Sequence, residues 1–170
     1  MAEMDEAILK RVLPHSIEAE QSVIGAMLMD REAITIASEQ INGDDFYGKQ
    51  YGILFDTMVE LNDEGKPVDL ITLQDRLKEK AVPPEIYSLE YIRDIMETVP
   101  TSANIKYYAN IVAEKSVLRK LIKVNEEIAN NCYSQKETLE VLLEETEKKV
   151  FDIAQTVSYT HLTLPTILRV

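Results

Sequence analysis

The stretch that decides the fold is residues 101–155, TSANIKYYANIVAEKSVLRKLIKVNEEIANNCYSQKETLEVLLEETEKKVFDIAQ. From Ile105 to Ile128 the apolar residues recur mostly three or four positions apart, which is the spacing of one face of a helix. No glycine or proline interrupts this stretch. The pattern predicts a first long helix, roughly 40 Å in length at about 1.5 Å per residue.

A polar segment, Asn130–Glu137, then predicts a turn. Within it Ser134 precedes Glu137 by three positions, which is the capping-box pattern, so we expect a second helix to begin at Gln135. The apolar face of that helix comprises Leu139, Leu142, Leu143, Val150 and Ile153. The two helices are predicted to fold back on each other as an antiparallel hairpin.

This hairpin has more apolar residues than one seam between two helices can bury. Tyr108, Leu121, Val124 and Val141 are expected to lie off the shared seam. They need either the preceding domain or a second chain to cover them, and both alternatives stay open at this point. An exposed apolar surface of this kind favours an oligomer interface.

Composition indicates an all-α fold. Hydrophobic residues make up 45% of the 170 residues, with only 5 glycines and 6 prolines, and this balance favours helices with an ordinary hydrophobic core. The single cysteine, Cys132, excludes an internal disulfide and a cysteine-based metal site. It is consistent with a reducing cytoplasm.

The net charge of −12 argues against binding to a phosphate backbone and favours basic protein partners. Residues 1–13 contain Glu3, Asp5 and Glu6, so they are predicted to be a flexible leader and not a secretory segment. No stretch approaches the roughly 20 apolar residues that span a membrane.

Residues 14–100 are predicted to form a compact bundle of five short helices. Ser16, Asp30 and Asp69 precede three of them as N-caps. Gly25 lies inside the first helix and is expected to mark a close helix crossing. The segment 81–85 is predicted to be a loop. The expected helices are 17–29, 31–41, 48–62, 70–80 and 88–98. The hairpin over 101–155 then follows the bundle.

The last residues, 156–170, differ from the rest because they contain no acidic residue and are rich in threonine. We interpret them as a non-native or out-of-frame tail, with a linker between domains as the alternative. Both interpretations place a boundary near Gln155.

Nothing in the sequence predicts a catalytic, cofactor or metal site. Gly43 and Gly48 have the glycine spacing of a phosphate-binding loop but lack its Lys-Ser/Thr ending. His15 and His161 are the only histidines, too few for a metal site of ordinary composition. The paired carboxylates lie on predicted solvated faces, where general acid–base chemistry is not favoured.

Several short motifs together resemble the N-terminal region of the bacterial replicative DNA helicases of the DnaB type. Their order and spacing over residues 13–155 carry the resemblance, and the residues beyond 155 do not match. The motifs are LPHSIEAEQSVIG (13–25), DFY (45–47), GKPVD (65–69), VPTSAN (99–104), YYA (107–109) and EKSVLR (114–119).

The resemblance implies an N-terminal helical domain that a linker joins to a RecA-like motor. Since this chain resembles only the first part, no catalytic residue carries over, and ATP and Mg would belong to the parent's motor domain. In this family the N-terminal domains pair through their hairpins and assemble as a trimer of dimers, a collar on the hexameric ring. The collar receives the helicase-binding domain of primase and, in some organisms, a helicase loader.

The resemblance also implies candidate residues. For hairpin pairing and packing they are Ile111, Leu118, Leu121, Ile122 and Ile128. For primase docking they are Glu18, Tyr91, Ile122 and Ile128.

The first hypothesis is therefore a cytoplasmic assembly and docking module of a replicative helicase that binds neither nucleic acid nor membrane itself. The second is a free-standing acidic helical adaptor for a basic protein partner. The third is an enzyme with an unfamiliar carboxylate site.

Overall fold

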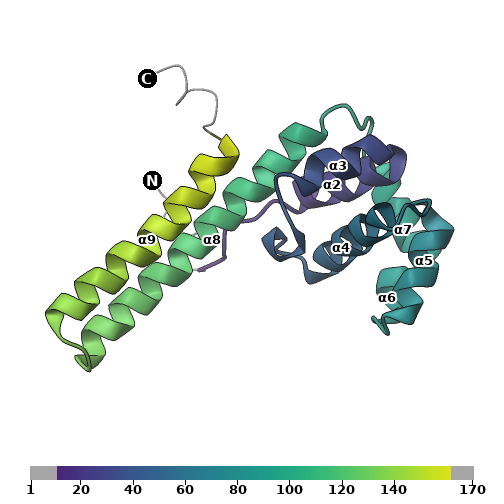
Figure 1. The fold of residues 1–170 in the computed structure, drawn as a ribbon. Helices are drawn as coiled ribbons and strands as arrows, with labels where there is room; N and C mark the ends of the chain where they lie inside the picture. Colours follow the sequence, from purple (N-terminus) through teal and green to yellow (C-terminus); the bar gives the residue numbers. More distant parts are fainter. Residues whose placement is uncertain (1–10, 162–170) are drawn as a thin grey trace, which may run out of the picture. The chain divides into compact units, whose positions relative to one another are not determined.

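The structure is a computed structural model that describes residues 11–161, with side-chain burial described as far as Val157. Within this range every regular element is a helix, which confirms the predicted all-α class with a helical bundle and a long antiparallel hairpin (Figure 1). The elements are α2 (Ile17–Met29), α3 (Arg31–Ser38), η1 (Gly43–Asp45), α4 (Lys49–Asp63), α5 (Leu70–Glu79), α6 (Pro84–Tyr87), α7 (Leu89–Glu97), α8 (Ile105–Ser134) and α9 (Leu139–His161).

The chain divides into two compact units, and we describe each by itself. The bundle unit comprises His15–Ser116, and the hairpin unit comprises, of the described residues, those up to Pro14 and those from Val117 onward. The division falls inside α8, whereas the sequence placed it near Pro100. The reason is visible at the start of α8, where Ile105, Ala109, Val112 and Ser116 are buried at helical spacing and belong to the bundle.

The predicted N-caps of the bundle are confirmed. The Ser16 hydroxyl accepts a hydrogen bond of 3.2 Å from the Ala19 amide, and Asp30 accepts one of 2.9 Å from the amide of Glu32. Asp69 forms a capping box with Thr72. These side chains occupy amide donors that the first helical turn leaves unpaired, so they fix where α2, α3 and α5 begin.

Gly25 allows α2 and α7 to pack closely, as the sequence predicts. A Cβ atom at Gly25 would lie 2.5 Å from Cγ2 of Val99 and 3.0 Å from the carbonyl oxygen of Ile95. The first distance is too short for a real side chain and the second is unusually tight, so the buried valine and the backbone would both have to shift. The glycine therefore permits a helix approach that alanine would widen.

Two helix boundaries in the bundle differ from the prediction. The segment 81–85, expected to be a loop, contains the start of the short helix α6, where Pro84 occupies the first turn. Proline is well suited to that position because its fixed φ is helical and its missing amide has no intrahelical partner there. The helix expected to reach Ile41 ends at Ser38.

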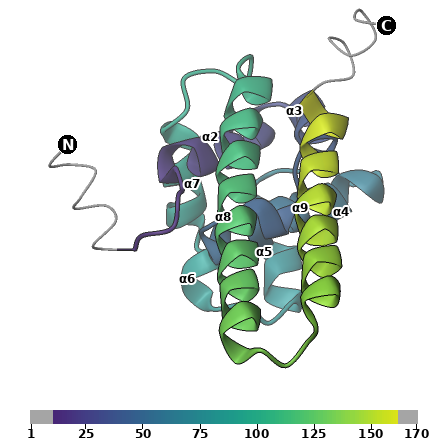
Figure 2. The same ribbon diagram turned by 90° about the vertical axis from the view of Figure 1, so that its left-hand side faces the viewer.

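The hairpin consists of α8 beyond Ser116 and α9, which lie side by side in two perpendicular views (Figures 1 and 2). The predicted start of the second helix at Gln135 is wrong. Ser134 is the last residue of α8, and Gln135 has a φ of 49°, which breaks the helix. The hydroxyl of Thr138 instead accepts a hydrogen bond of 3.4 Å from the Val141 amide, so α9 begins at Leu139.

The two ends of the chain also bear on the sequence interpretation. α9 continues past Gln155 to His161, so the residues from Thr156 onward do not all lie outside the fold. The Thr156 hydroxyl donates a hydrogen bond of 3.0 Å to the carbonyl of Asp152, one turn earlier in α9. The remainder of the expected tail, 162–170, and residues 1–10 of the expected leader lie outside the described residues, and Arg11, Val12 and Leu13 are exposed.

Candidate protein-interaction surfaces

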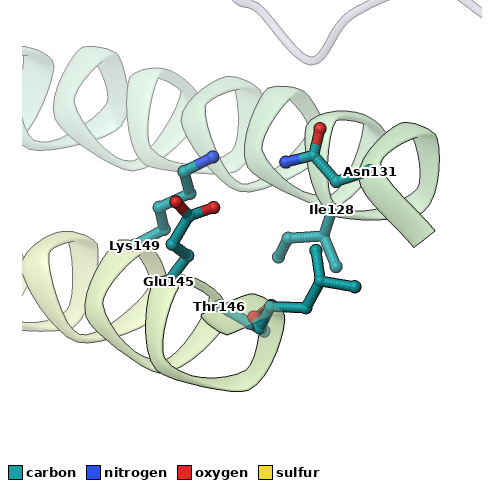
Figure 3. A pocket seen from close by; sticks show the side chains of 6 residues that line it. Ile128, Asn131, Glu145, Thr146 and Lys149 are labelled. Atoms are coloured by element: carbon teal, nitrogen blue, oxygen red, sulfur yellow. Dashed lines mark hydrogen bonds between the residues drawn. The ribbon is translucent and has the colours of Figure 1, made fainter. Parts of the chain in front are cut away.

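The seam between α8 and α9 is closed around Ile128. Ile128 and Asn131 of α8 face Leu142, Glu145, Thr146 and Lys149 of α9 across a space too narrow to admit water (Figure 3). Lys149 also forms an ion pair with Glu127, with 3.4 Å between Nζ and Oε2. These apolar and polar side chains together fix the register of the hairpin. Much of the hairpin's apolar surface lies away from this seam.

Leu121 and Val124 share the seam with Ile128. The three residues are half-buried and are spaced three and four apart, which places them on one side of α8. The expectation that Leu121 and Val124 lie off the seam is therefore wrong, and Tyr108 packs against the bundle core instead. Val141 is half-buried on α9.

The leftover apolar surface lies one position after the seam on each helix. On α8 this shift leads from Leu121 and Ile128 to Ile122 and Ala129, and on α9 it leads from Leu142 to Leu143. Because the helices are antiparallel and share the same hand, a one-residue shift turns both helices toward the same flank of the hairpin. We call this flank the apolar flank; its members are Leu118, Ile122, Ala129, Leu139, Leu143, Val150 and Ala154.

Four large residues of the apolar flank are exposed to solvent, and a fifth, Ile122, is half-buried. The exposed fractions are 43% for Leu118, 73% for Leu139, 61% for Leu143 and 42% for Val150. Phe151 is also exposed, but it lies on the outer side of α9 among Glu140, Glu144 and Glu147. An apolar flank along both helices, interrupted by Asn125 on α8 and Glu147 on α9, is typical of a protein interface, whereas one isolated exposed side chain is ordinary.

Leu139, Leu143 and Val150 were predicted to lie on the apolar face of the second helix, and they were not among the predicted interface residues. The apolar stripe of α9 is wide enough for two adjoining faces, and only the inner one reaches α8. The signal that separates them is the seam spacing of Leu142, Thr146, Lys149 and Ile153, which requires the register of the hairpin.

The five residues predicted for pairing fall into three places. Leu118 and Ile122 lie on the apolar flank, whereas Leu121 and Ile128 lie in the seam. Ile111 belongs to the bundle unit, where it packs partly buried against the core.

The four residues predicted for primase docking are divided between the units. Glu18 and Tyr91 belong to the bundle unit, and Ile122 and Ile128 belong to the hairpin unit. Glu18 is exposed on the first turn of α2, while the other three are half-buried.

Tyr91 takes part in a hydrogen-bonded group that ties α7 to α4 and α2. It is hydrogen-bonded to Tyr51 and Gln50, and Gln21 donates a bond of 2.9 Å from Nε2 to the Tyr51 hydroxyl. Burial, reinforced by the neighbouring Tyr51, raises the pKa of the Tyr91 hydroxyl well above its ordinary value. Tyr91 is thus a neutral, positioned phenol.

Two buried carboxylates hold the loop between η1 and α4. Glu20 is 1% exposed and accepts hydrogen bonds from the amides of Tyr47 (2.7 Å) and Gly48 (3.0 Å). Asp45 accepts a 2.6 Å bond from the Ser116 hydroxyl. Each carboxylate has specific donors within the bundle, so both have a structural explanation and neither needs a catalytic one.

Other kinds of site find no support in residues 11–161. In that range no three of the His, Cys, Asp and Glu side chains are grouped so that they could hold a metal ion. Across the same range no helix has both the length and the apolar character needed to cross a membrane. Cys132 is exposed near the end of α8.

Fold and surfaces together define an all-helical domain whose distinctive feature is an amphipathic hairpin with an open apolar flank. A family model for the DnaB-like helicase N-terminal domain matches residues 12–114. The chain belongs to this family.

Individual relatives agree with the family assignment. The chain is 41% identical to the replicative DNA helicase DnaC of Bacillus subtilis over 152 residues, which are 89% of this chain and 34% of the relative. It therefore spans about a third of the length of the curated relatives that it matches.

Solved structures match the fold. The crystal structure of the N-terminal domain of DnaB helicase from Mycobacterium tuberculosis superposes with a TM-score of 0.77 and 31% identity, covering 82% of this chain and 99% of that one. The N-terminal domain of DnaB helicase from Helicobacter pylori, described with its interactions with primase, has a TM-score of 0.60 at 21% identity and covers 68% and 90%. At that identity the second match concerns the fold alone.

Proposed function

We propose that this chain is the assembly and partner-docking domain of a hexameric replicative DNA helicase. The observation that carries the proposal is the open apolar flank of the hairpin, in a chain of the DnaB-like N-terminal family. A second copy of the chain supplies the matching surface, because a two-fold interface buries the same patch on both partners. Dimers formed in this way then build a trimer of dimers as a collar.

Within this proposal the predicted pairing residues have two roles. Leu118 and Ile122 contact the second copy from the apolar flank. Leu121 and Ile128 hold α8 against α9 and so keep the flank flat. Ile111 serves packing, since it lies partly buried against the core of the bundle unit.

Primase docking is the second part of the proposal. The domain from Helicobacter pylori is described with its interactions with primase, and we extend that partner to this chain. Glu18 supplies an exposed carboxylate for a basic group, whereas Tyr91, Ile122 and Ile128 supply partly exposed apolar contacts. A helicase loader is a further proposed partner.

The remaining functions belong to the parent protein in this proposal. A motor domain binds ATP and Mg and unwinds DNA, and the domain described here binds neither ATP nor nucleic acid. The net charge of −12 disfavours contact between this domain and the phosphate backbone of DNA. The cytoplasm is the proposed location, since replication takes place there.

Sedimentation velocity and a binding titration test the two parts separately. The proposal expects the 170-residue chain to form dimers or larger assemblies as its concentration rises, and to bind a primase helicase-binding domain. A strict monomer at high micromolar concentration would contradict the pairing part. Absence of binding to the primase domain would contradict docking, and binding of other basic proteins instead would favour the free-standing adaptor.

A further inference from the structure

A groove in the bundle unit remains outside the surfaces described so far. Its volume is about 430 Å³, and η1 with the first turns of α4 form its walls. The lining combines apolar and aromatic side chains with both signs of charge. The lining residues are Gly43, Asp44, Phe46, Tyr47, Lys49, Gly52, Ile53 and Asp56.

Two glycines make one wall of the groove close-fitting. A Cβ atom at Gly52 would lie 2.4 Å from the carbonyl oxygen of Gly43, and one at Gly43 would lie within 2.6 Å of all three atoms of the Asp56 carboxylate. Backbone and carboxylate can approach only because both side chains are absent. The wall is completed by a hydrogen bond of 2.9 Å from the Gly43 amide to Oδ1 of Asp56.

The loop that carries the aromatic residues is fixed from beneath. The Glu20 carboxylate accepts bonds from the amides of Tyr47 and Gly48, and Asp45 is bonded to Ser116. The ring of His15 stacks on Tyr47, with 4.0 Å between ring centroids. A groove held by buried charged groups in this way is formed before any ligand arrives, which lowers the cost of binding.

The charge of the groove favours a cation. Asp44 and Asp56 contribute two carboxylates against the single ammonium of Lys49. Burial raises the pKa of Asp56 above its ordinary value, and nearby Asp44 and Glu60 add to the rise, whereas the Gly43 amide and Lys80 oppose it. A positive group between the two carboxylates would relieve their repulsion.

The shape and chemistry of the lining narrow the cation further. Phe46 is buried, Ile53 is half-buried, and Tyr47 is 42% exposed. Such a lining accommodates the methylene stem of a long side chain, and two neighbouring carboxylates favour the forked donors of an arginine guanidinium over a single hydrated ammonium.

We propose that this groove is a docking site for a protein segment that inserts an arginine side chain, with the guanidinium between Asp44 and Asp56 and the stem over Phe46 and Ile53. The site is independent of hairpin pairing, because all of its lining residues belong to the bundle unit. Lys49, on the first turn of α4, limits the site to a segment without an adjoining second cation.

The test is a titration of the full chain with a peptide, monitored by relaxation-optimised ¹H–¹⁵N NMR spectra. The probe is the acetylated and amidated pentapeptide Ala-Leu-Arg-Leu-Ala, and its control carries citrulline, which is uncharged and nearly the same shape. We expect saturable chemical-shift changes at the amides of Gly43, Asp44, Gly52 and Ile53. The citrulline peptide is expected to bind at least about tenfold more weakly than the arginine peptide, because a charge-assisted hydrogen bond is lost.

Two variants make the test specific. D44N and D56N each remove one negative charge but keep an oxygen acceptor, so they preserve the fold and are expected to weaken the arginine peptide about tenfold. D75N, an exposed carboxylate on α5 outside the groove, is the matched control and leaves binding unchanged. Shifts scattered over the acidic surface, equal binding of the citrulline peptide, or groove shifts that depend only on the concentration of the chain would each overturn the proposal.

Discussion

Replacement of Leu143 by serine tests the apolar flank most simply. Leu143 is 61% exposed in the single chain. Full burial of a leucine side chain contributes about 1.5–3 kcal/mol, so covering the exposed part contributes about 1–2 kcal/mol per copy. In a two-fold pair both copies bury the residue, which doubles the loss to about 2–4 kcal/mol.

This loss corresponds to a rise in the dimer dissociation constant of roughly 30-fold to several hundred-fold, since about 1.4 kcal/mol is one factor of ten. The free energy of unfolding of a single chain is expected to change by less than about 0.5 kcal/mol, because the residue is exposed there. Sedimentation equilibrium measures the association constant, and chemical denaturation at low concentration measures folding.

Phe151→Ser is the matched control. Phe151 is 56% exposed on the same helix but lies on its outer, acidic side and not on the apolar flank. We expect L143S to weaken self-association and F151S to leave it unchanged. If the two variants behave alike, or if F151S has the larger effect, the assignment of the flank is refuted.

Three further predictions concern the bundle. Gly25→Ala is expected to destabilise the bundle by about 1–3 kcal/mol, since the new methyl group overpacks the α2–α7 contact. Thermal or denaturant unfolding at fixed concentration measures the loss of stability, and an unchanged unfolding midpoint would show that the helix crossing can widen freely. Glu20→Gln keeps one acceptor but places an amide donor opposite the second backbone amide, so the free energy of unfolding is expected to fall by about 1–3 kcal/mol in the same assay. The Tyr47 amide is expected to lose hydrogen-exchange protection, and full retention of that protection would argue against the carboxylate's role. The Arg76 guanidinium and then Lys66 lower the pKa of Glu64 to about 2, so their stabilising effect is present above the ordinary pKa of 4.5 and is lost as the pH falls toward about 2. Arg76→Ala is expected to raise the pKa of Glu64, which a carboxyl NMR titration would detect. An unchanged pKa would exclude the ion pair as the cause.

The bundle was largely predictable because its signals are local. Ser16, Asp30 and Asp69 cap their helices through side chains two or three residues away from the amides that they bind. Gly25 in the interior of a helix likewise predicts a close crossing with another helix, and the structure confirms this crossing with α7.

The hairpin turn was harder to predict because two polar residues compete for the same role. Ser134 and Thr138 both precede helix-forming sequence, and only the second caps α9. The Ser134 hydroxyl instead donates back to the carbonyl of Asn131 inside α8. Sequence cannot decide between such alternatives when packing against the other helix sets the length of the turn.

The candidate surfaces show the same limit. Periodicity identifies Leu121, Ile122 and Leu143 as members of an apolar stripe, but the seam and the flank differ by a single residue position. That difference depends on the register between α8 and α9, which Ile128, Leu142 and the Glu127–Lys149 pair establish. The groove beside η1 was missed because backbone approach at Gly43 and Gly52 forms it, with no motif in the sequence.

The most direct test of the central claim is an isotope-filtered NOE spectrum of a sample that mixes labelled and unlabelled chains. Such a spectrum detects only contacts between different copies. The proposed pairing predicts intermolecular NOEs to the methyl groups of Leu118, Leu143 and Val150 and none to Phe151. Intermolecular NOEs confined to the Phe151 side, or no intermolecular NOE at concentrations where the chain stays folded, would contradict it.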